Sequence, residues 1–578
     1  MVRTDQKSVR GVVGTSSKRR AKGKPKGRQV SEAASTEIRA LLQDRKLQRD
    51  HLVEYLHLVQ DTYGHLSAAH LAALAHELKI SQAEVYEVAS FYHHFDLVRE
   101  DGVAPPPITI RVCDSISCML QGAEQLREAL AAQVDPSRVR VVHAPCMGAC
   151  DAAPVAKVGQ RLVPQADPAK VADVLAAGDL SPLVPASQSL ASYRDEGGFR
   201  SLLDLRSGTT SVDEILRVLE AAGLRGLGGA GFPAFRKWTF VRSRPGPRYL
   251  CVNADEGEPG TFKDRYFLEQ RPFQFLEGVL IAAWGVEAEQ VYIYLRDEYP
   301  EARVILLDAI AQAESEGLIP AGYVELRRGA GAYICGEESA MIESIEGKRG
   351  LPRHRPPYVA QAGLFGRPTL VHNVETLSWL PLILRNGSEW FSVQGKPGHK
   401  GPRTYSVSGR VRRPGLVLAP AGSTVRELIE RCGGMAEGHS FAAYLPGGAS
   451  GGILPASLGD LPLDFGTLEQ HGCFVGSHAI VVLSDQDDLR IVARNLMEFF
   501  RYESCGQCTP CRVGTEKAVG LMKQEVWDEP LMRELARTMA DASICGLGQA
   551  APNAMLSVLK AYRPATTNAD VSPADRQS

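Results

Sequence analysis

Apolar residues recur at steps of three and four positions over residues 32–100, which is typical of helices with one buried face. Ser81, with Glu84 three residues later, fits a capping box at the start of one helix. We therefore expect a small helical bundle here. His93 and His94 follow its last apolar positions; adjacent residues of a helix do not share a face, so packing or surface placement is favoured over a histidine metal site.

The pattern then changes to short apolar runs separated by helical segments over residues 101–185. Strands are predicted at Ile108–Val112 and Val139–His143, with a helix at Gly122–Gln133 between them. Two shorter strands and a helix beginning at Asp167 follow. This order predicts a compact βαβββα unit.

Three further regions follow from the same patterns. Residues 186–395 alternate helices and strands, as a layered α/β domain does. Residues 396–484 contain short β-like runs around one helix and predict a β-grasp-like module, and residues 485–566 are again helical. The longest apolar run, Phe275–Val286, contains Glu277 and falls short of the roughly 20 residues of a membrane span. The predicted fold class is multidomain α/β.

The composition is that of a globular protein, with 578 residues, 44% hydrophobic, 23% charged and a formal net charge of −2. This balance argues against nucleic acid or a membrane as the main partner. Residues 1–31 form a basic tail expected to be disordered and to dock on an acidic partner subunit, with a nucleic-acid arm as the alternative. Residues 567–578 are expected to be disordered. Nothing resembles a secretory signal, so a cytoplasmic protein is expected.

Four cysteines near the C-terminus have the spacing of a metal centre. Cys505, Cys508 and Cys511 lie three residues apart, and Cys545 is set in a separate Gly-rich segment. Iron–sulfur clusters are held by four cysteine thiolates. Structural zinc sites more often take their cysteines as two close pairs, so the spacing favours a [4Fe–4S] cluster over zinc.

A second quartet lies on two loops that follow the predicted strands of residues 101–185. Its members are Cys113 and Cys118 after one strand, and Cys146 and Cys150 after the other. Loops at the same ends of neighbouring strands place four thiolates around one [2Fe–2S] cluster, although a zinc knot or two disulfides remain alternatives. Three other cysteines, Cys335, Cys432 and Cys473, are expected to be packed thiols.

Three Gly-rich loops punctuate the α/β region. They span residues 223–233, 253–264 and 329–338, and the second and third also carry paired acids. Glycines let the backbone approach a phosphate, and carboxylates accept hydrogen bonds from ribose or ribityl hydroxyls. A structural turn or a solvated acidic loop explains each loop taken alone. Together they predict a pocket for a flat, hydroxylated and phosphorylated ligand.

These motifs resemble a known family. The segments Gly226–Pro233, Asn253–Asp264, Gly331–Glu338 and Glu503–Cys511 resemble the NADH-oxidising, FMN-binding subunit of respiratory complex I, the 51-kDa-like subunit. Residues 32–185 resemble the small 24-kDa-like, thioredoxin-like [2Fe–2S] subunit of that complex, fused upstream. The resemblance implies a thioredoxin-like [2Fe–2S] domain, a Rossmann-like FMN/NAD domain, an SLBB module at residues 396–484 and a [4Fe–4S] helical bundle.

The resemblance also implies site residues. Those expected to hold FMN are Gly226, Gly228, Gly229, Lys237, Asn253, Asp255, Glu256, Tyr333, Gly336, Glu337 and Asn373. NAD(H) is expected near Phe232, Lys237, Phe240, Glu258 and Glu338, with adenine stacking on the two phenylalanines and with Glu258 and Glu338 orienting the nicotinamide. Arg355 and Tyr358 stand where many relatives have Lys and Phe, and His372 where Asn is common, which puts a flavin contact at His372 in doubt.

The fused form resembles the β subunit of cytoplasmic NAD-dependent formate dehydrogenases, whose molybdenum or tungsten centre lies in a separate α subunit. It is also similar to the diaphorase subunit of NAD-linked hydrogenases. Both resemblances imply exchange of electrons between iron–sulfur clusters and NAD⁺/NADH through FMN. A cluster relay without nucleotide and a zinc-built scaffold are the alternatives of another class.

Overall fold

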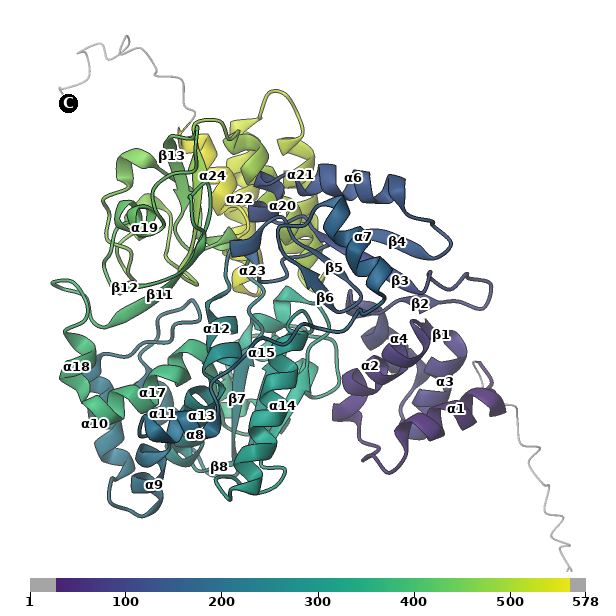
Figure 1. Ribbon diagram of the computed structural model, residues 1–578, viewed down its shortest axis with the longest axis horizontal. Helices are drawn as coiled ribbons and strands as arrows, with labels where there is room; N and C mark the ends of the chain where they lie inside the picture. The colour runs from purple at the N-terminus through teal and green to yellow at the C-terminus, as the bar shows by residue number, and fades with distance from the viewer. Residues whose placement is uncertain (1–27, 562–578) are drawn as a thin grey trace, which may run out of the picture.

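The computed structural model describes residues 28–561, and Figure 1 shows the order of its units along the chain. The mixed α/β fold with several sheets and two helical regions agrees with the predicted fold class. The predicted C-terminal tail lies outside the described residues, as does the predicted basic tail up to residue 27.

The N-terminal bundle forms because each of its helices buries the apolar face that the sequence predicts. Its helices are α1 (Glu32–Leu42), α2 (Leu52–Tyr63), α3 (Ala68–Leu78) and α4 (Gln82–Phe91). The capping box at Ser81 and Glu84 is confirmed, with both reciprocal hydrogen bonds 3.1 Å long. The helix placement of the two histidines was wrong: α4 ends at Phe91, so His93 and His94 lie in the following turn, where helix faces do not apply.

The next unit contains a four-stranded sheet in the order β4-β3-β5-β6. Its elements are β3 (Ile108–Cys113), α5 (Ile116–Leu120), α6 (Ala123–Gln133), β4 (Val139–Ala144), β5 (Ala156–Val158), β6 (Arg161–Val163) and α7 (Pro168–Ala177). β3 and β4 are parallel, with Cys113 opposite Ala144 in the register. The loops that follow these two strands therefore leave the same edge of the sheet, as predicted.

The central unit is built on a parallel sheet in the order β10-β7-β8-β9. Its strands are β7 (Arg248–Ala254), β8 (Ala288–Leu295), β9 (Val324–Arg328) and β10 (Thr369–Asn373). Its main helices are α10 (Val212–Ala222), α11 (Ala234–Arg242), α12 (Lys263–Gln270), α13 (Pro272–Val286), α14 (Pro300–Ser315), α15 (Glu338–Ile345) and α17 (Val374–Asn386). Parallel strands end at a common edge, where α/β folds bind their ligands.

The long apolar run of the sequence is the buried helix α13. All but one of its side chains are buried, and the Glu277 carboxylate within it accepts a 2.9 Å hydrogen bond from the backbone N–H of Phe199. Among residues 28–561, no helix combines the length and apolar character needed to cross a bilayer.

The last two units lie side by side at the top of Figure 1. A five-stranded mixed sheet in the order β12-β11-β15-β13-β14 surrounds α19 (Val425–Arg431). Its strands are β11 (Pro402–Gly409), β12 (Gly415–Pro420), β13 (Phe441–Leu445), β14 (Leu454–Pro455) and β15 (Ala479–Ser484). The C-terminal bundle consists of α20 (Leu489–Glu503), α21 (Thr509–Met522), α22 (Glu529–Ala542), α23 (Gly546–Ala550) and α24 (Asn553–Ala561).

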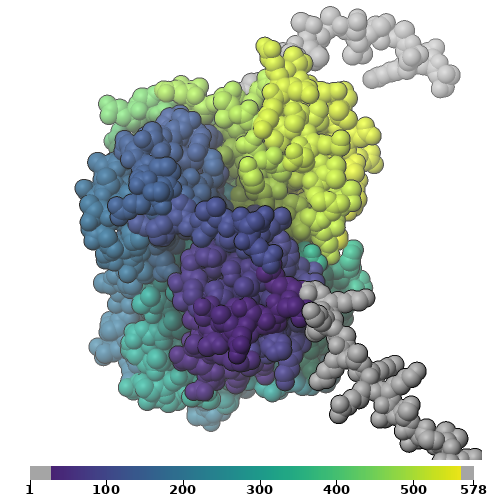
Figure 2. All heavy atoms as spheres, turned by 90° about the vertical axis from the view of Figure 1, so that its right-hand side faces the viewer, coloured from purple at the N-terminus to yellow at the C-terminus, as the bar shows by residue number. Residues whose placement is uncertain are grey.

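Charged side chains join the N-terminal bundle to the central unit; the bundle is the purple region of Figure 2. Arg327 of β9 is 1% exposed and pairs with Asp50 and Glu54 of the bundle at 3.5 and 3.1 Å. Nearby, Nε2 of His51 lies 3.1 Å from a carboxylate oxygen of Glu325. Because one ion pair of this interface contains a histidine, its strength depends on pH.

This histidine gives a pH prediction. Hydrogen bonds to Asp50 and Glu325 raise the pKa of His51 from 6.5 to about 9. A pKa raised by folding means that the stabilisation is full below pH 6.5 and is lost as pH rises through about 9. We expect the thermal unfolding temperature to fall less steeply over this window in His51→Asn than in the wild type. The exposed His76→Asn variant should keep the wild-type slope; equal slopes in all three would refute the assignment.

Candidate functional site

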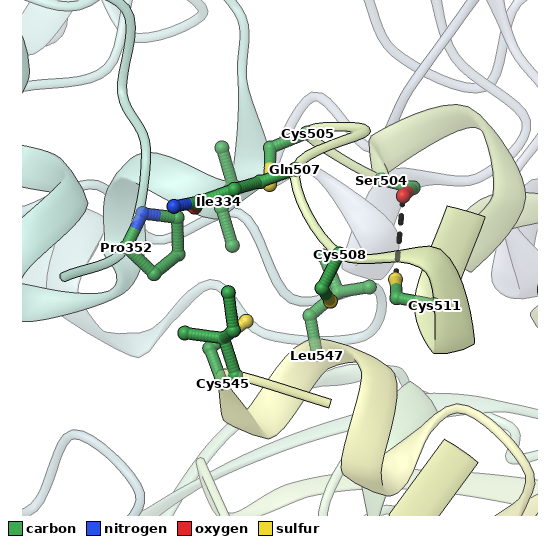
Figure 3. Close-up of a pocket in the computed structure, with 10 residues that line it drawn as sticks. Ile334, Pro352, Ser504, Cys505, Gln507, Cys508, Cys511, Cys545 and Leu547 are labelled. Carbon is green, nitrogen blue, oxygen red and sulfur yellow. Dashed lines mark hydrogen bonds between the residues drawn. The ribbon is translucent and has the colours of Figure 1, made fainter. Parts of the chain in front are cut away.

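The C-terminal cysteines converge on one hollow. Cys505 and Cys508 lie in the loop between α20 and α21, Cys511 lies in the first turn of α21, and Cys545 is the N-cap of α23. The hollow is also lined by Ile334, Pro352, Ser504, Gln507, Ile544 and Leu547. Figure 3 shows the four cysteines around it. The structure therefore brings together the four predicted ligands from two separate segments.

The spacing of the sulfurs argues for a cluster rather than a single zinc ion. With Zn–S bonds of ~2.3 Å, the sulfurs of a tetrahedral zinc site lie ~3.8 Å apart. Among the described residues, no three cysteine sulfurs lie within 4.8 Å of one another. The four sulfurs are therefore spaced more widely than the ligands of a single zinc ion. Burial raises the pKa of Cys511 to about 11 and that of Cys545 to about 12, so the metal-free site holds protons that metal binding would release.

The second quartet is completely buried. Cys113 ends β3 and Cys118 lies in α5, whereas Cys146 and Cys150 follow β4, with their sulfurs 3.4 Å apart. All twelve cysteines of the chain are described and none forms a disulfide, so the disulfide alternative is not observed. A close pair on each loop fits a [2Fe–2S] cluster, in which two cysteines bind each iron.

The surroundings of this second quartet include the central unit. Cys146 and Cys150 pack against Phe262, which belongs to the acidic loop between β7 and α12. A backbone carbonyl of Cys146 accepts a hydrogen bond from the buried Arg296 guanidinium. The acidic loop thus contacts the second quartet with one part and the edge of the parallel sheet with the other.

At that edge, the glycines of two loops make room for close backbone approach. A Cβ on Gly228 would lie 3.0 Å from Cβ of Asn373 at the end of β10, and one on Gly336 would lie 3.2 Å from the carbonyl oxygen of Asp255. Asn253, at the end of β7, donates a 2.8 Å hydrogen bond to the carbonyl of Gly336. The predicted loops therefore meet here. A side chain larger than glycine at either position would crowd the neighbouring backbone or side chain.

Two neighbouring acids of the acidic loop, Asp255 and Glu256, have different environments. The Asp255 carboxylate has no hydrogen-bond donor within residues 28–561, and burial raises its pKa well above 3.8. Glu256 accepts hydrogen bonds from the backbone N–H groups of Asp264 and Arg265 at the start of α12, at 2.8 and 3.2 Å. A half-buried carboxylate without donors suits a ligand rich in hydroxyl groups, whereas Glu256 already has internal partners.

Glu258 joins the acidic loop to the β-grasp-like unit and to Tyr333 of the third Gly-rich loop. One carboxylate oxygen of Glu258 accepts from the backbone N–H and the hydroxyl of Ser450, at 2.8 and 2.7 Å, and the other accepts from the Tyr333 hydroxyl. The predicted orienting acid is therefore held from both sides. Ser450 belongs to the β-grasp-like unit, and no sequence motif pointed to it.

A line of alternating charges borders the edge. Lys237 lies 3.7 Å from Glu338, and Arg355 lies 3.2 Å from Glu338 and also pairs with Glu337. Glu337 and Arg355 line a cleft of about 430 Å³ that reaches Cys545. The predicted nucleotide residues are thus grouped next to the C-terminal cysteine site.

Three predicted residues of this region are exposed, and a fourth is buried. Phe232 and Phe240 are 38% and 54% exposed, with ring centroids 6.3 Å apart, and Tyr358 is 54% exposed. Exposed rings at this distance offer a surface on which a base can stack. His372 is different: its Nε2 accepts a 3.0 Å hydrogen bond from Trp238, and its burial lowers its pKa well below 6.5. This neutral histidine supports the packing of α11 on β10.

Two sets of buried groups were missed by sequence reasoning. Lys263 is 1% exposed and pairs with Asp264 at 2.8 Å and with Glu375 at 2.9 Å; Glu375 lies far away in the sequence. Arg296, which follows β8, donates to the carbonyl of Glu256 as well as to that of Cys146. The one sequence feature that pointed to a role for any of these groups was the position of Arg296 at the end of a strand.

One short segment contacts both the sheet edge and the C-terminal cysteine site. It is the 3₁₀ helix Tyr333–Gly336 (η3), in which the Gly336 carbonyl is bound to Asn253 while Ile334 lines the hollow of the four cysteines. The backbone N–H of Tyr333 donates a 2.9 Å hydrogen bond to Glu503, two residues before Cys505. A group bound at the edge would therefore lie one segment away from a cluster.

Family models match most of the chain. Residues 38–179 match the thioredoxin-like [2Fe-2S] ferredoxin, and residues 219–381 match the Nuo51 FMN-binding domain. Residues 404–454 match the SLBB domain, and residues 491–569 match the NADH-ubiquinone oxidoreductase-F iron-sulfur binding region.

Relatives that align over most of their own length decide the family. An NADH-quinone oxidoreductase subunit of Rhizobium meliloti (strain 1021) is 41% identical over 396 residues, which are 66% of this chain and 94% of that protein. The mitochondrial 51 kDa subunit of the NADH-ubiquinone oxidoreductase of Neurospora crassa is 40% identical over 61% of this chain and 76% of its own length. The chain belongs to this 51 kDa flavoprotein family.

As a member of the 51 kDa flavoprotein family, the chain is an NAD-dependent flavin and iron–sulfur oxidoreductase subunit. Its cofactors are FMN, NAD(H), a [4Fe–4S] cluster and a [2Fe–2S] cluster. These relatives match about two thirds of this chain. A solved structure matches a larger share: a chain of an NAD⁺-reducing [NiFe]-hydrogenase is 31% identical and has a TM-score of 0.78, with 89% of this chain and 91% of that chain covered.

Proposed function

We propose that the chain passes electrons between iron–sulfur clusters and NAD⁺/NADH as the diaphorase subunit of a larger complex. The observation that carries the proposal is η3, which contacts the predicted flavin edge through Gly336 and the predicted [4Fe–4S] ligands through Ile334. Bound FMN supplies the exchange between the two electrons of a hydride and the single electrons of clusters.

The residues of this chain would position the reactants. Gly226, Gly228, Gly229 and Gly336 let the backbone approach FMN, and Asp255 and the strand-end residues Asn253 and Asn373 offer hydrogen-bond partners. Lys237 places a cation at the same edge, bound to the carbonyl of Val371 at 3.2 Å. Glu258 is held rigidly, and Glu338 is fixed between two cations; both are suited to orienting a nicotinamide amide rather than to proton transfer.

The eight cysteines divide into two proposed cluster sites. Cys505, Cys508, Cys511 and Cys545 would bind the [4Fe–4S] cluster next to η3, and Cys113, Cys118, Cys146 and Cys150 the [2Fe–2S] cluster beside the acidic loop. We also propose that the five structural units span residues 32–100, 101–185, 186–395, 396–484 and 485–566.

For the electron donor, we propose formate. In this proposal a separate α subunit, with a molybdenum or tungsten pterin and further clusters, oxidises formate to CO₂ in the cytoplasm and delivers electrons to this chain. The fusion of the [2Fe–2S] part to the FMN part supports this proposal, since the fused form resembles such β subunits. The test is purification from the native host, followed by assays of formate- and hydrogen-dependent NAD⁺ reduction.

A hydrogenase partner is the second candidate. The likeness to the NAD⁺-reducing [NiFe]-hydrogenase chain favours it, because that likeness covers the fused N-terminal part as well. Copurification of a molybdenum or tungsten subunit with formate activity supports the first proposal. A nickel-containing subunit with hydrogen activity would replace it. Formate oxidation by the isolated chain would contradict both.

The exposed phenylalanines provide a test of nucleotide binding. Phe240→Ala removes one face of the proposed adenine site, and stacked aromatic pairs contribute about 0.5–1.5 kcal/mol. We therefore expect KM for NADH to rise about 2–12-fold with kcat nearly unchanged, because adenine lies far from the reacting carbon. The matched control is Tyr86→Ala, which removes an exposed ring of α4 and should leave both constants unchanged. A fall in kcat without a change in KM would contradict this placement.

A further inference from the structure

Two histidines and an aspartate meet at the interface between the N-terminal bundle and the central sheet. His57 and Asp61 lie four residues apart in α2 and so share one face of the helix, and His94 lies in the turn after α4. One ring nitrogen of each histidine and a carboxylate oxygen of Asp61 lie within 4.8 Å of one another. The two imidazole centroids are 4.7 Å apart.

The hydrogen bonds of the two imidazoles determine which nitrogens are free. Nε2 of His57 lies 2.8 Å from the carbonyl oxygen of Gly329, which only accepts, so this nitrogen carries the proton. Nδ1 of His94 lies 2.9 Å from the Asp297 carboxylate and is a donor in the same way. The other two nitrogens, Nδ1 of His57 and Nε2 of His94, are buried and have no partner among the described residues.

This pattern is that of metal-binding histidines, which donate their second N–H to a carboxylate or backbone carbonyl and turn the lone pair of the other nitrogen to the metal. His57 is 2% exposed, so the missing partner of its Nδ1 is not replaced by bulk water. Asp61 is half-exposed and leaves a side open for a solvent ligand.

The local charges allow a cation. Arg328 pairs with both Asp61 and Asp297 at 2.5 Å, so two carboxylates face one guanidinium. A carboxylate has four lone-pair positions, and Asp61 can therefore bind Arg328 and an ion together. Arg303 also interacts electrostatically with Asp61 and Asp297, and Arg111 and Lys157 do so with Asp297.

We propose that His57, Asp61 and His94 bind one divalent transition-metal ion, with Zn²⁺ as the best match to two imidazoles, one carboxylate and an open position. The ion would fix the segment that leads into η3. The carbonyl of Gly329 is bound by His57, and that of Ala330 accepts from the backbone N–H of His94 at 3.3 Å. A metal at this interface would thus hold the N-terminal bundle against the loop that joins the flavin edge to the [4Fe–4S] ligands.

The test compares zinc binding in holoprotein purified without air, after removal of loosely bound metal with a weak chelator. The wild type should retain about one zinc per chain in addition to iron. Asp61→Asn, at a half-exposed position, and His94→Gln should each lose this zinc with iron and FMN contents unchanged. Titration of each variant with Zn²⁺ should show that its affinity for zinc falls by more than the roughly 10–100-fold that is typical when a residue hydrogen-bonded to a metal ligand is lost.

The matched control is His70→Gln. His70 belongs to the same bundle and pairs with Glu37 at 2.8 Å, but it has no third ligand nearby among the described residues. Its zinc content should equal that of the wild type. Equal zinc content and affinity in the wild type and Asp61→Asn, or zinc that varies only with the loss of cluster iron, would overturn the proposal.

Discussion

Cys545→Ala should yield a chain that still binds FMN and oxidises NADH but no longer exchanges electrons with its partner subunit. The substitution removes the ligand that closes the hollow from the side of α23. A [4Fe–4S] cluster requires four thiolates, so iron should fall by about four atoms per chain. NADH-dependent reduction of a dye that takes electrons from flavin should persist, because no predicted flavin residue is altered.

The control is Cys432→Ala, which removes a buried thiol of the β-grasp-like unit without changing either quartet. It should keep the wild-type iron content and partner-linked activity. Cys508→Ala, in the half-exposed loop, provides a second variant in case Cys545→Ala does not fold. Full iron content and full partner-linked activity in both ligand variants would show that this quartet does not bind the cluster.

Asp255→Asn should weaken FMN binding while it stabilises the flavin-free protein. The carboxylate is half-buried without a donor among the described residues, and a charged acceptor makes hydrogen bonds stronger than a neutral one does by about 1–2 kcal/mol each. For each bond to a flavin hydroxyl, affinity should therefore fall about 5–30-fold. Fluorescence titration of flavin-free protein with FMN gives this number directly.

In the same variant, the expected change in the stability of the flavin-free protein is opposite in direction to the change in FMN affinity. Burial raises the pKa of Asp255 well above 3.8, so the contribution of this one group to the stability of the flavin-free protein is greatest below pH 3.8 and is lost as pH rises through the raised pKa. Asparagine does not titrate, and the variant should thus unfold at a higher temperature than the wild type at pH 8. Asp213→Asn, at an exposed position of α10, should change neither property. Unchanged FMN affinity in Asp255→Asn would remove Asp255 from the site.

The strand-end motifs and cysteine spacings were readable from the sequence because they are local. Cys505, Cys508 and Cys511 lie within one loop and helix turn, and apolar runs located β3 and β4 to within one residue. The prediction that loops after parallel strands converge held for the same reason, since register fixes which ends share an edge.

What the sequence could not give depends on contacts between distant segments. Glu256 looked like its neighbours, yet it binds the N-terminal turn of α12, whereas Asp255 remains without a donor among the described residues. Ser450 holds Glu258 from a different unit, and His94 pairs with Asp297 across an interface. These roles follow from tertiary packing, which apolar periodicity and short motifs do not encode.

The central claim is that electrons pass through η3 between the Gly-rich edge of the parallel sheet and the site of the four C-terminal cysteines. The most direct measurement is addition of NADH, without air, to natively purified protein, followed by absorbance and electron paramagnetic resonance spectroscopy. We expect bleaching of a yellow flavin together with the signal of the reduced [4Fe–4S] cluster, and this [4Fe–4S] signal is absent in Cys545→Ala, which keeps the ligands of the [2Fe–2S] cluster. Flavin bleaching in the wild type without this [4Fe–4S] signal, or the same signal unchanged in Cys545→Ala, would contradict the claim.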